Sequence, residues 1–148
     1  MRSVAIGGII GLVGVALRAW AAGHLAKNEQ LATSGPYAYV RNPLYVGTLI
    51  VGIGFGIAGA NWAIGALLVA FFIVYYLPVV EEEESHLAKI LEGYDEYRRQ
   101  TPKLWPRLTP AYSDGLRFRS SLYLRNQEYQ ALFGYLVVLA GLTAKAAL

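Results

Sequence analysis

The chain contains no cysteine and only two histidines, His24 and His86, among its 148 residues. Without cysteine it can form no disulfide, no thiolate metal site and no cysteine nucleophile. Neither a His-x-x-x-His pair nor acid-rich metal spacing accompanies the histidines, so no metal site is predicted. Charged residues are scarce as well, at 16% of the chain against about 25% in a typical soluble domain. With 55% hydrophobic residues, this composition indicates a protein that lies in lipid.

Four apolar stretches approach the roughly 20 residues that a helix needs to cross a bilayer. They predict one domain over residues 1–148, an all-α polytopic membrane helix bundle with about four transmembrane helices, a cytoplasmic helix and an interfacial loop. The first stretch could instead be a signal peptide, but no small-x-small cleavage site is followed by a soluble domain, so a retained helix is favoured. The stretches are Val4–Ala22, Leu44–Ala60, Trp62–Val80 and Glu128–Leu148.

The connections between these stretches are polar. A tight turn at residues 59–61 predicts that the second and third spans form an antiparallel hairpin. Pro78 is expected to kink the third span. A polar helix is expected over Glu81–Arg99, where apolar residues recur at helical spacing, and an interfacial loop over Lys103–Arg119.

Basic residues are unevenly distributed. Eleven of the 13 lysines and arginines lie in or beside the two long connections, and the exceptions are Arg2 and Lys145 near the outer ends. The positive-inside rule therefore predicts cytoplasmic connections and an integral, multi-pass membrane protein. Nucleic acid is not an expected partner, because acidic residues interleave with the basic ones.

The predicted hairpin returns Arg41 and four consecutive glutamates, Glu81 to Glu84, to one membrane face. The glutamates could form a solvated acidic face, but successive helix positions diverge by about 100°, so one or two are expected to turn inward. Arg41 could be a positive-inside anchor or a clamp for a carboxylate or phosphate. Its neighbours Tyr37 and Tyr45 could be interfacial belt residues or an aromatic ligand wall.

The glycines of the second span have two interpretations. Small residues allow close helix packing in lipid, which is the favoured interpretation. Alternatively, Gly47 leaves space for a ligand beside the Arg41 segment.

Two segments around the hairpin resemble the signatures of a known family. The first is Leu31-Ala-Thr-Ser-Gly-Pro-Tyr37, followed by Arg41-Asn-Pro-x-Tyr45-x-Gly47, and the second is Glu83-Glu-x-x-Leu87 with Tyr94-x-x-Tyr97. Together they resemble the isoprenylcysteine carboxyl methyltransferase and phospholipid methyltransferase family of integral membrane enzymes. The resemblance covers about residues 29–110 and keeps the order and the hairpin spacing of the two signatures.

The resemblance implies an S-adenosylmethionine-dependent methyltransferase with its site on the cytoplasmic face. The acceptor would be a lipophilic or membrane-embedded small molecule, methylated on a carboxyl oxygen or an amine nitrogen, with membrane lipids as neighbours. Members often carry histidine where Glu29 and Asn42 stand. The implied catalytic residues are Arg41, Asn42 and Tyr45. The implied cofactor-binding residues are Leu31, Ala32, Thr33, Gly35, Tyr37, Asn42, Pro43, Glu83 and Glu84.

An alternative function remains open at this point. The same pattern suits a non-catalytic four-helix membrane protein that acts as a subunit or small-molecule binder. Methyl transfer needs no dedicated base when the acceptor is a carboxylate or a neutral amine, so the lack of a clear base does not decide between the two. The oligomeric state and the identity of the acceptor are not indicated by the sequence.

Overall fold

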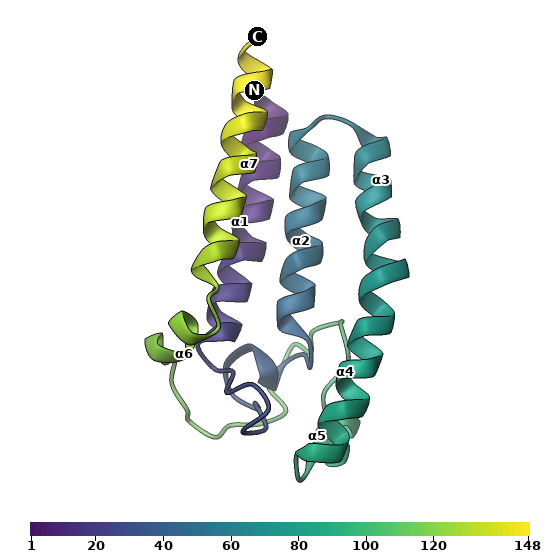
Figure 1. The fold of residues 1–148 in the computed structure, drawn as a ribbon, viewed down its shortest axis with the longest axis vertical. Helices are drawn as coiled ribbons and strands as arrows, with labels where there is room; N and C mark the ends of the chain where they lie inside the picture. Colours follow the sequence, from purple (N-terminus) through teal and green to yellow (C-terminus); the bar gives the residue numbers. More distant parts are fainter.

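The computed structural model describes residues 1–148 as a bundle of helices without strands. Three helices are long and apolar enough to cross a membrane: α1 (Arg2–Ala22), the continuous helix Trp62–Ile90 and α7 (Tyr129–Ala147). The fourth apolar helix, α2 (Pro43–Ala58), has 16 residues, which is about 24 Å of helix. The predicted helical membrane bundle is confirmed. Both chain ends lie at one end of the bundle, and the long connections lie at the other (Figure 1).

Helices α1 and α2 pack closely through their glycines. A Cβ atom added at Gly7 would lie 2.3 Å from the carbonyl oxygen of Gly54. At Gly47 an added Cβ would lie 2.5 Å from Cγ of Arg18 and 2.7 Å from the carbonyl oxygen of Gly14. Close helix packing is therefore confirmed as the role of these glycines. The alternative for Gly47 is wrong, because the space beside it is filled by α1 and not open to a ligand.

The predicted hairpin is also confirmed. Gly59 ends α2, and Asn61 caps the next helix, accepting hydrogen bonds from the backbone N–H groups of Ala63 and Ile64 at 3.0 and 3.3 Å. Helix α3 (Trp62–Phe71) then runs antiparallel to α2 (Figure 1). The ends of this hairpin therefore meet at the face that carries the long connections.

Helix α3 continues through a π-helical turn, η2 (Phe72–Tyr76), into α4 (Leu77–Ile90). Pro78 has no N–H, and its ring would clash with the carbonyl of Val74, one helical turn earlier. The π-helical turn lies over that carbonyl, so the distortion expected at Pro78 is a local widening and the helix continues.

The polar helix predicted to reach Arg99 is interrupted, and this boundary was wrong. Helix α4 ends at Ile90, Gly93 adopts a left-handed conformation with φ 79°, and α5 (Tyr94–Gln100) begins after it. Glycine enters this conformation without the steric cost that a Cβ imposes, so the chain turns there. The turn directs α5 back towards the first connection.

The two long connections pack against each other. The first contains a short 3₁₀ helix, η1 (Gly35–Ala38). The irregular segment after α5 donates its backbone N–H groups of Arg107 and Ala111 to the carbonyls of Tyr39 and Ala38 at 2.9 and 2.7 Å. A short helix that the sequence analysis did not predict, α6 (Ser120–Arg125), precedes α7.

Candidate functional site

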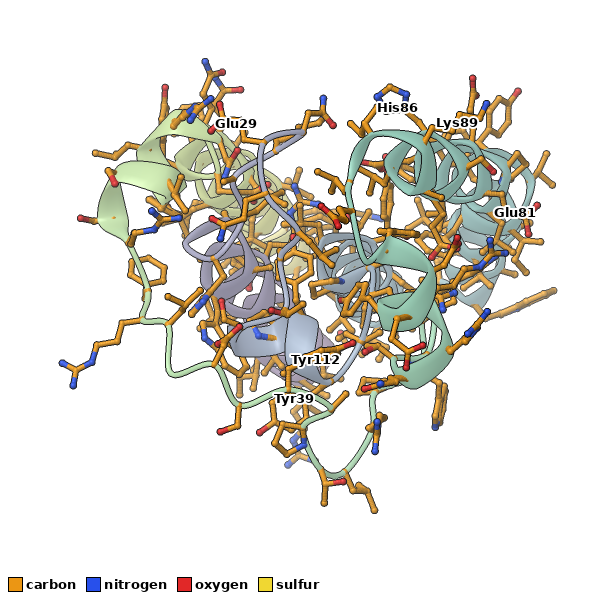
Figure 2. All side chains as sticks on the ribbon, turned by 90° about the horizontal axis from the view of Figure 1, so that it is seen from below. Glu29, Tyr39, Glu81, His86, Lys89 and Tyr112 are labelled. Carbon is orange, nitrogen blue, oxygen red and sulfur yellow. The ribbon has the colours of Figure 1, made fainter.

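The candidate site lies where η1, the start of α2, α4 and α5 meet at the connection end of the bundle. The four glutamates separate here according to the rotation of α4. Glu81 is exposed and points outward, as do His86 and Lys89 (Figure 2). Glu84 is 2% exposed, and Glu83 is partly buried. The expectation that one or two of the glutamates turn inward is therefore confirmed for Glu83 and Glu84.

Arg41 and Glu84 form a buried, two-pronged ion pair. Nε of Arg41 donates to Oε1 of Glu84 at 2.9 Å, and a terminal nitrogen donates to Oε2 at 3.3 Å. The other terminal nitrogen donates to the carbonyls of Arg98 and Thr101 at 2.6 and 2.9 Å. The side chains are 8% and 3% exposed. Four of the five N–H groups of Arg41 are thus used within the chain, and this fork joins α2, α4 and the end of α5.

Asn42 and Lys103 complete the surroundings of Glu84. The Asn42 amide donates to Oε1 of Glu84 at 2.7 Å and to the carbonyl of Lys103 at 3.2 Å. Nζ of Lys103 lies 3.9 Å from Glu84 and 3.1 Å from Glu81. Each oxygen of the Glu84 carboxylate therefore has a donor or a cation beside it, and none is left for a ligand without displacing part of this network.

Glu83 differs from Glu84 in this respect. Its Oε2 accepts a hydrogen bond from the hydroxyl of Tyr45 at 2.8 Å, and its Oε1 has no partner in the chain. Tyr45 also contacts Tyr76 edge-on, with ring centroids 5.7 Å apart. The start of α2 thus orients a carboxylate of α4 that still has a free oxygen.

That carboxylate lies on the wall of a cavity between the first connection, α4 and α5. Of the residues predicted to bind a cofactor, Leu31, Ala32, Tyr37, Asn42 and Glu83 line this cavity, and Arg41 lines it too. The remaining lining residues are Leu25, Lys27, Asn28, Gln30, Leu87, Leu91, Tyr94 and Tyr97. The backbone N–H groups of Leu31, Ala32 and Thr33 donate no hydrogen bond within the chain. The cavity wall therefore includes a carboxylate with one free oxygen, residues with unpaired backbone N–H groups and aromatic rings.

The aromatic rings of the cavity wall are neutral phenols. The Tyr97 hydroxyl donates to the carbonyl of Tyr37 at 2.8 Å, and the Tyr94 and Tyr97 rings lie 6.0 Å apart. Burial raises the pKa of Tyr94 to about 12, and the nearby Glu84 carboxylate adds to the rise. Burial likewise raises the pKa of Tyr37 and of Tyr97. These phenols therefore stay protonated at neutral pH and provide flat, uncharged surfaces.

Four predicted cofactor residues do not line this cavity: Thr33, Gly35, Pro43 and Glu84. The Thr33 hydroxyl donates to Asp114 at 2.7 Å. Gly35 has φ 56°, and a Cβ there would lie 2.5 Å from the His24 ring, so this glycine allows the first connection to fold onto His24. Pro43 begins α2. These residues shape the elements around the cavity.

An ion pair that the sequence analysis missed lies beside the site. Arg18 binds both carboxylate oxygens of Glu128, with Nε at 3.0 Å, and also donates to the Thr48 hydroxyl at 2.6 Å and the Leu44 carbonyl at 3.2 Å. These contacts join α1, α2 and the start of α7. The only sequence signal was a charge at the end of each apolar stretch, which a snorkelling anchor explains equally well.

An apolar groove lies between α2 and α3 within the bilayer-spanning part. Gly52 and Leu68 line it on opposite helices, and it extends to Phe72 and Tyr76 of the π-helical turn. The Phe72 and Tyr76 rings are stacked, with centroids 5.4 Å apart. Since Tyr76 contacts Tyr45, the groove ends next to the residue that orients Glu83.

Comparison with known proteins gives the family. Residues 16–93 match the sequence profile of the phospholipid methyltransferase family. The cobalt-zinc-cadmium resistance protein CzcN of Cupriavidus metallidurans is 38% identical over 106 residues, which cover 68% of this chain and 49% of the relative. The nickel-cobalt-cadmium resistance protein NccN of Alcaligenes xylosoxydans xylosoxydans is 32% identical over 106 residues, covering 68% and 50%. The chain thus spans about half the length of these two relatives.

A third relative is named for its reaction. The protein-S-isoprenylcysteine O-methyltransferase of Schizosaccharomyces pombe is 31% identical over 77 residues, which cover 51% of this chain and 33% of the relative. No solved structure matches. The profile match covers both inward glutamates, the Arg41 segment and the helices that carry them. The chain belongs to the phospholipid methyltransferase family.

Proposed function

We propose that the protein transfers a methyl group from S-adenosylmethionine to a lipophilic acceptor at the cytoplasmic face of a membrane. The observation that carries this proposal is the free Oε1 of Glu83, a residue on the wall of a cavity that is also lined by Leu31 and Ala32, whose backbone N–H groups are unpaired. The family supports the reaction class, and the basic connections support the cytoplasmic face.

The donor set of the cavity fits the cofactor. S-adenosylmethionine has an ammonium group and a ribose diol, both of which donate hydrogen bonds, and a flat base that accepts them. Glu83 can accept from the ammonium or the diol, and the free backbone donors of Leu31 and Ala32 can bind the base or the carboxylate. The neutral Tyr94 and Tyr37 rings offer flat surfaces for the base. When bound, the cofactor would supply an electrophilic methyl group for direct displacement.

In this proposal Arg41, Asn42 and Glu84 are positioning residues. Their hydrogen bonds join α2, α4 and α5 around the cavity, and most of their donors and acceptors are satisfied within the chain. This network keeps Glu83 and the aromatic wall in one arrangement. Methyl transfer would then be accelerated by the alignment of cofactor and acceptor and by the exclusion of water. The idea that Arg41 clamps the cofactor's carboxylate is not needed, since four of its five N–H groups are already used.

The groove between α2 and α3 supports a lipophilic acceptor. A hydrocarbon chain lying along Gly52 and Leu68 would place its polar end near Tyr45, at the edge of the cavity that holds Glu83. Access from the bilayer would then leave the cytoplasmic side free for the cofactor. Filling the groove by Gly52→Leu is expected to reduce transfer to lipid without changing cofactor affinity. Gly141→Leu, on α7 with nothing within 4 Å of the added Cβ, is the matched control.

Calorimetric titration of S-adenosylmethionine into the detergent-purified protein tests the cofactor assignment. Glu83→Gln is expected to weaken binding by about ten- to a hundred-fold, the loss of one charge-assisted hydrogen bond. Glu81→Gln is the matched control, because Glu81 is exposed and outside the cavity. Absence of binding to the wild type, or equal affinities in the two variants, would refute the assignment. Labelled cofactor with a native lipid extract then identifies the acceptor.

Two relatives are named for metal resistance and not for a reaction, so the second candidate is a non-catalytic small-molecule binder within such a system. Growth on cobalt, zinc and cadmium salts separates the two candidates when wild type and Gly52→Leu are compared in a strain that lacks the gene, because this variant is expected to keep cofactor affinity and lose transfer. If methyl transfer underlies tolerance, Gly52→Leu fails to restore growth. If the protein serves only as a binder, the variant restores growth as well as wild type does.

A further inference from the structure

A second polar cavity adjoins the proposed cofactor site, between the first connection and the segment that precedes α6. It is lined by His24 and Ser34 from one side and by Arg117 and Arg119 from the other, with apolar residues between them. It shares only Gln30, Leu31 and Ala32 with the proposed cofactor cavity. Neither the matched profile, which ends at residue 93, nor the proposed methyl transfer uses the two arginines.

The backbone of Arg119 attaches this segment to the end of α1. Its N–H donates to the carbonyl of Gly23 at 2.9 Å. Between Arg117 and Arg119, the Phe118 ring lies edge-on against His24, with centroids 6.4 Å apart. Arg117 and Arg119 both line the cavity, and both side chains are also exposed to solvent.

Neither guanidinium has a partner within the chain. No carboxylate oxygen lies within 4 Å of either guanidinium, and neither makes a side-chain hydrogen bond. Asp114, the carboxylate that acts on His24, already accepts from the Thr33 hydroxyl and the Leu116 N–H at 2.7 and 3.3 Å. Two unpaired guanidinium groups beside one occupied carboxylate leave the cavity with net positive charge. Planar guanidinium forks bind phosphate oxygens in pairs.

The opposite wall offers polar groups of the right kind. Nδ1 of His24 lies 2.8 Å from the Ser34 hydroxyl, and burial lowers the pKa of His24, with Asp114 acting against this and Arg119 adding to it. With Nδ1 accepting from Ser34, the neutral ring would carry its proton on Nε2, where it can be donated. The wall therefore places an imidazole ring and a hydroxyl beside the two cations.

The position of the cavity favours a lipid head group over a soluble molecule as the source of the phosphate. It lies at the connection end of α1, one turn beyond Trp20, which is 45% exposed on that helix. Leu116 and Phe118 of the same segment are 58% and 47% exposed. Exposed aromatic and aliphatic side chains at the end of a membrane helix lie at the depth of lipid head groups. We infer that Arg117 and Arg119, with His24, bind the phosphate of an anionic phospholipid head group, in a cavity that adjoins the proposed cofactor cavity.

The test uses a lipid probe with the intact protein in detergent. Dihexanoyl phosphatidylglycerol is titrated calorimetrically into the wild type, Arg117→Gln/Arg119→Gln and the control Lys89→Gln/Arg99→Gln. The control removes two exposed basic side chains at the same end of the bundle. We expect one site in the wild type and the control, and affinity at least about tenfold weaker in the arginine variant. Equal affinities in all three proteins would overturn the inference.

Further ligands distinguish a lipid phosphate from a soluble one, and a further variant keeps the test valid if the double arginine variant misfolds. Glycerol phosphate that binds as tightly as the lipid would overturn the lipid assignment, as would equal binding of dihexanoyl phosphatidylcholine. Leu116→Glu adds a carboxylate to the cavity from an exposed position and is expected to weaken the lipid by the same factor. Wild-type lipid affinity in this variant would also overturn the inference. Because the probe reports lipid binding alone, failure to bind S-adenosylmethionine leaves the result standing.

Discussion

Glu84→Gln should destabilise the fold far more than Glu83→Gln, although the two residues are neighbours. The Glu84 carboxylate accepts from two nitrogens of Arg41 and from Asn42, and it is 2% exposed. A glutamine has one acceptor oxygen and one donor nitrogen at this position. The nitrogen would face a donor of Arg41, which would keep its charge without a counterion in a buried place.

The magnitude follows from the burial of the pair. Removing one partner of a buried ion pair costs about 3–5 kcal/mol. Glutamine keeps one acceptor, so about 3 kcal/mol is expected for Glu84→Gln, a large part of a typical domain stability of about 5–15 kcal/mol. Glu83 is partly exposed, and glutamine can still accept from Tyr45. Its substitution should change stability by less than about 0.5 kcal/mol.

Equilibrium unfolding in mixed micelles of a mild detergent and dodecyl sulfate, followed by circular dichroism, measures both variants. Glu82→Gln, at an exposed neighbouring position, controls for the loss of one charge from the acidic run. Cofactor affinity should show the opposite order, with Glu83→Gln weakened and still fully folded. The reasoning fails if Glu84→Gln unfolds at the wild-type midpoint, or if both inward variants lose the same stability.

Three further predictions concern the fork, the helix contact and the topology. Arg41→Lys keeps the charge, but a single ammonium group cannot bind Glu84 and two carbonyls at once, so the rate of methyl transfer at equal folded protein should fall about tenfold while membrane insertion is unchanged. A wild-type rate in this variant would show that Arg41 is only a membrane anchor. Gly54→Ala places a Cβ 2.6 Å from the Gly11 nitrogen and should lower the free energy of unfolding by about 1–3 kcal/mol. The control Gly141→Ala has open space around its Cβ and should leave that free energy unchanged, so equal unfolding midpoints for the two variants would contradict the prediction. Single cysteines at Ser113, in the connection between α5 and α6, and at Ala146, in the last turn of α7, should react with impermeant maleimide from opposite sides, the first from the cytoplasm. Labelling of both from one side would exclude this orientation of the bundle.

Properties that depend on a local stretch of chain were predictable from the sequence. The apolar lengths of α1, α3 and α7, the glycine-asparagine turn after α2 and the close packing of glycines all follow from composition and short-range pattern. The approach of Arg41 to the inward glutamates also followed, because an antiparallel hairpin must return both ends to one face. These inferences need only the length of a helix and the geometry of one turn.

The different roles of Glu83 and Glu84 could be seen only in the tertiary structure, where Glu84 pairs with Arg41 and Glu83 accepts from Tyr45. Adjacent helical residues differ by about 100° in direction, so which one meets Arg41 depends on the rotation of α4. The π-helical turn over Phe72–Tyr76 contributes to that rotation. The break at Gly93 then brings the carbonyls of Arg98 and Thr101 to the same guanidinium.

The sequence by itself determined that this is a membrane helix bundle of a methyltransferase family with charged motifs on one face. Only the tertiary structure decided that Arg41 is bound within the chain, that Glu83 keeps a free oxygen and that Arg18 pairs with Glu128, 110 residues away. The physical reason is that helix formation and burial in lipid are set by local composition. The pairing of buried charges depends on how distant helices rotate and pack against one another, and no local pattern records that.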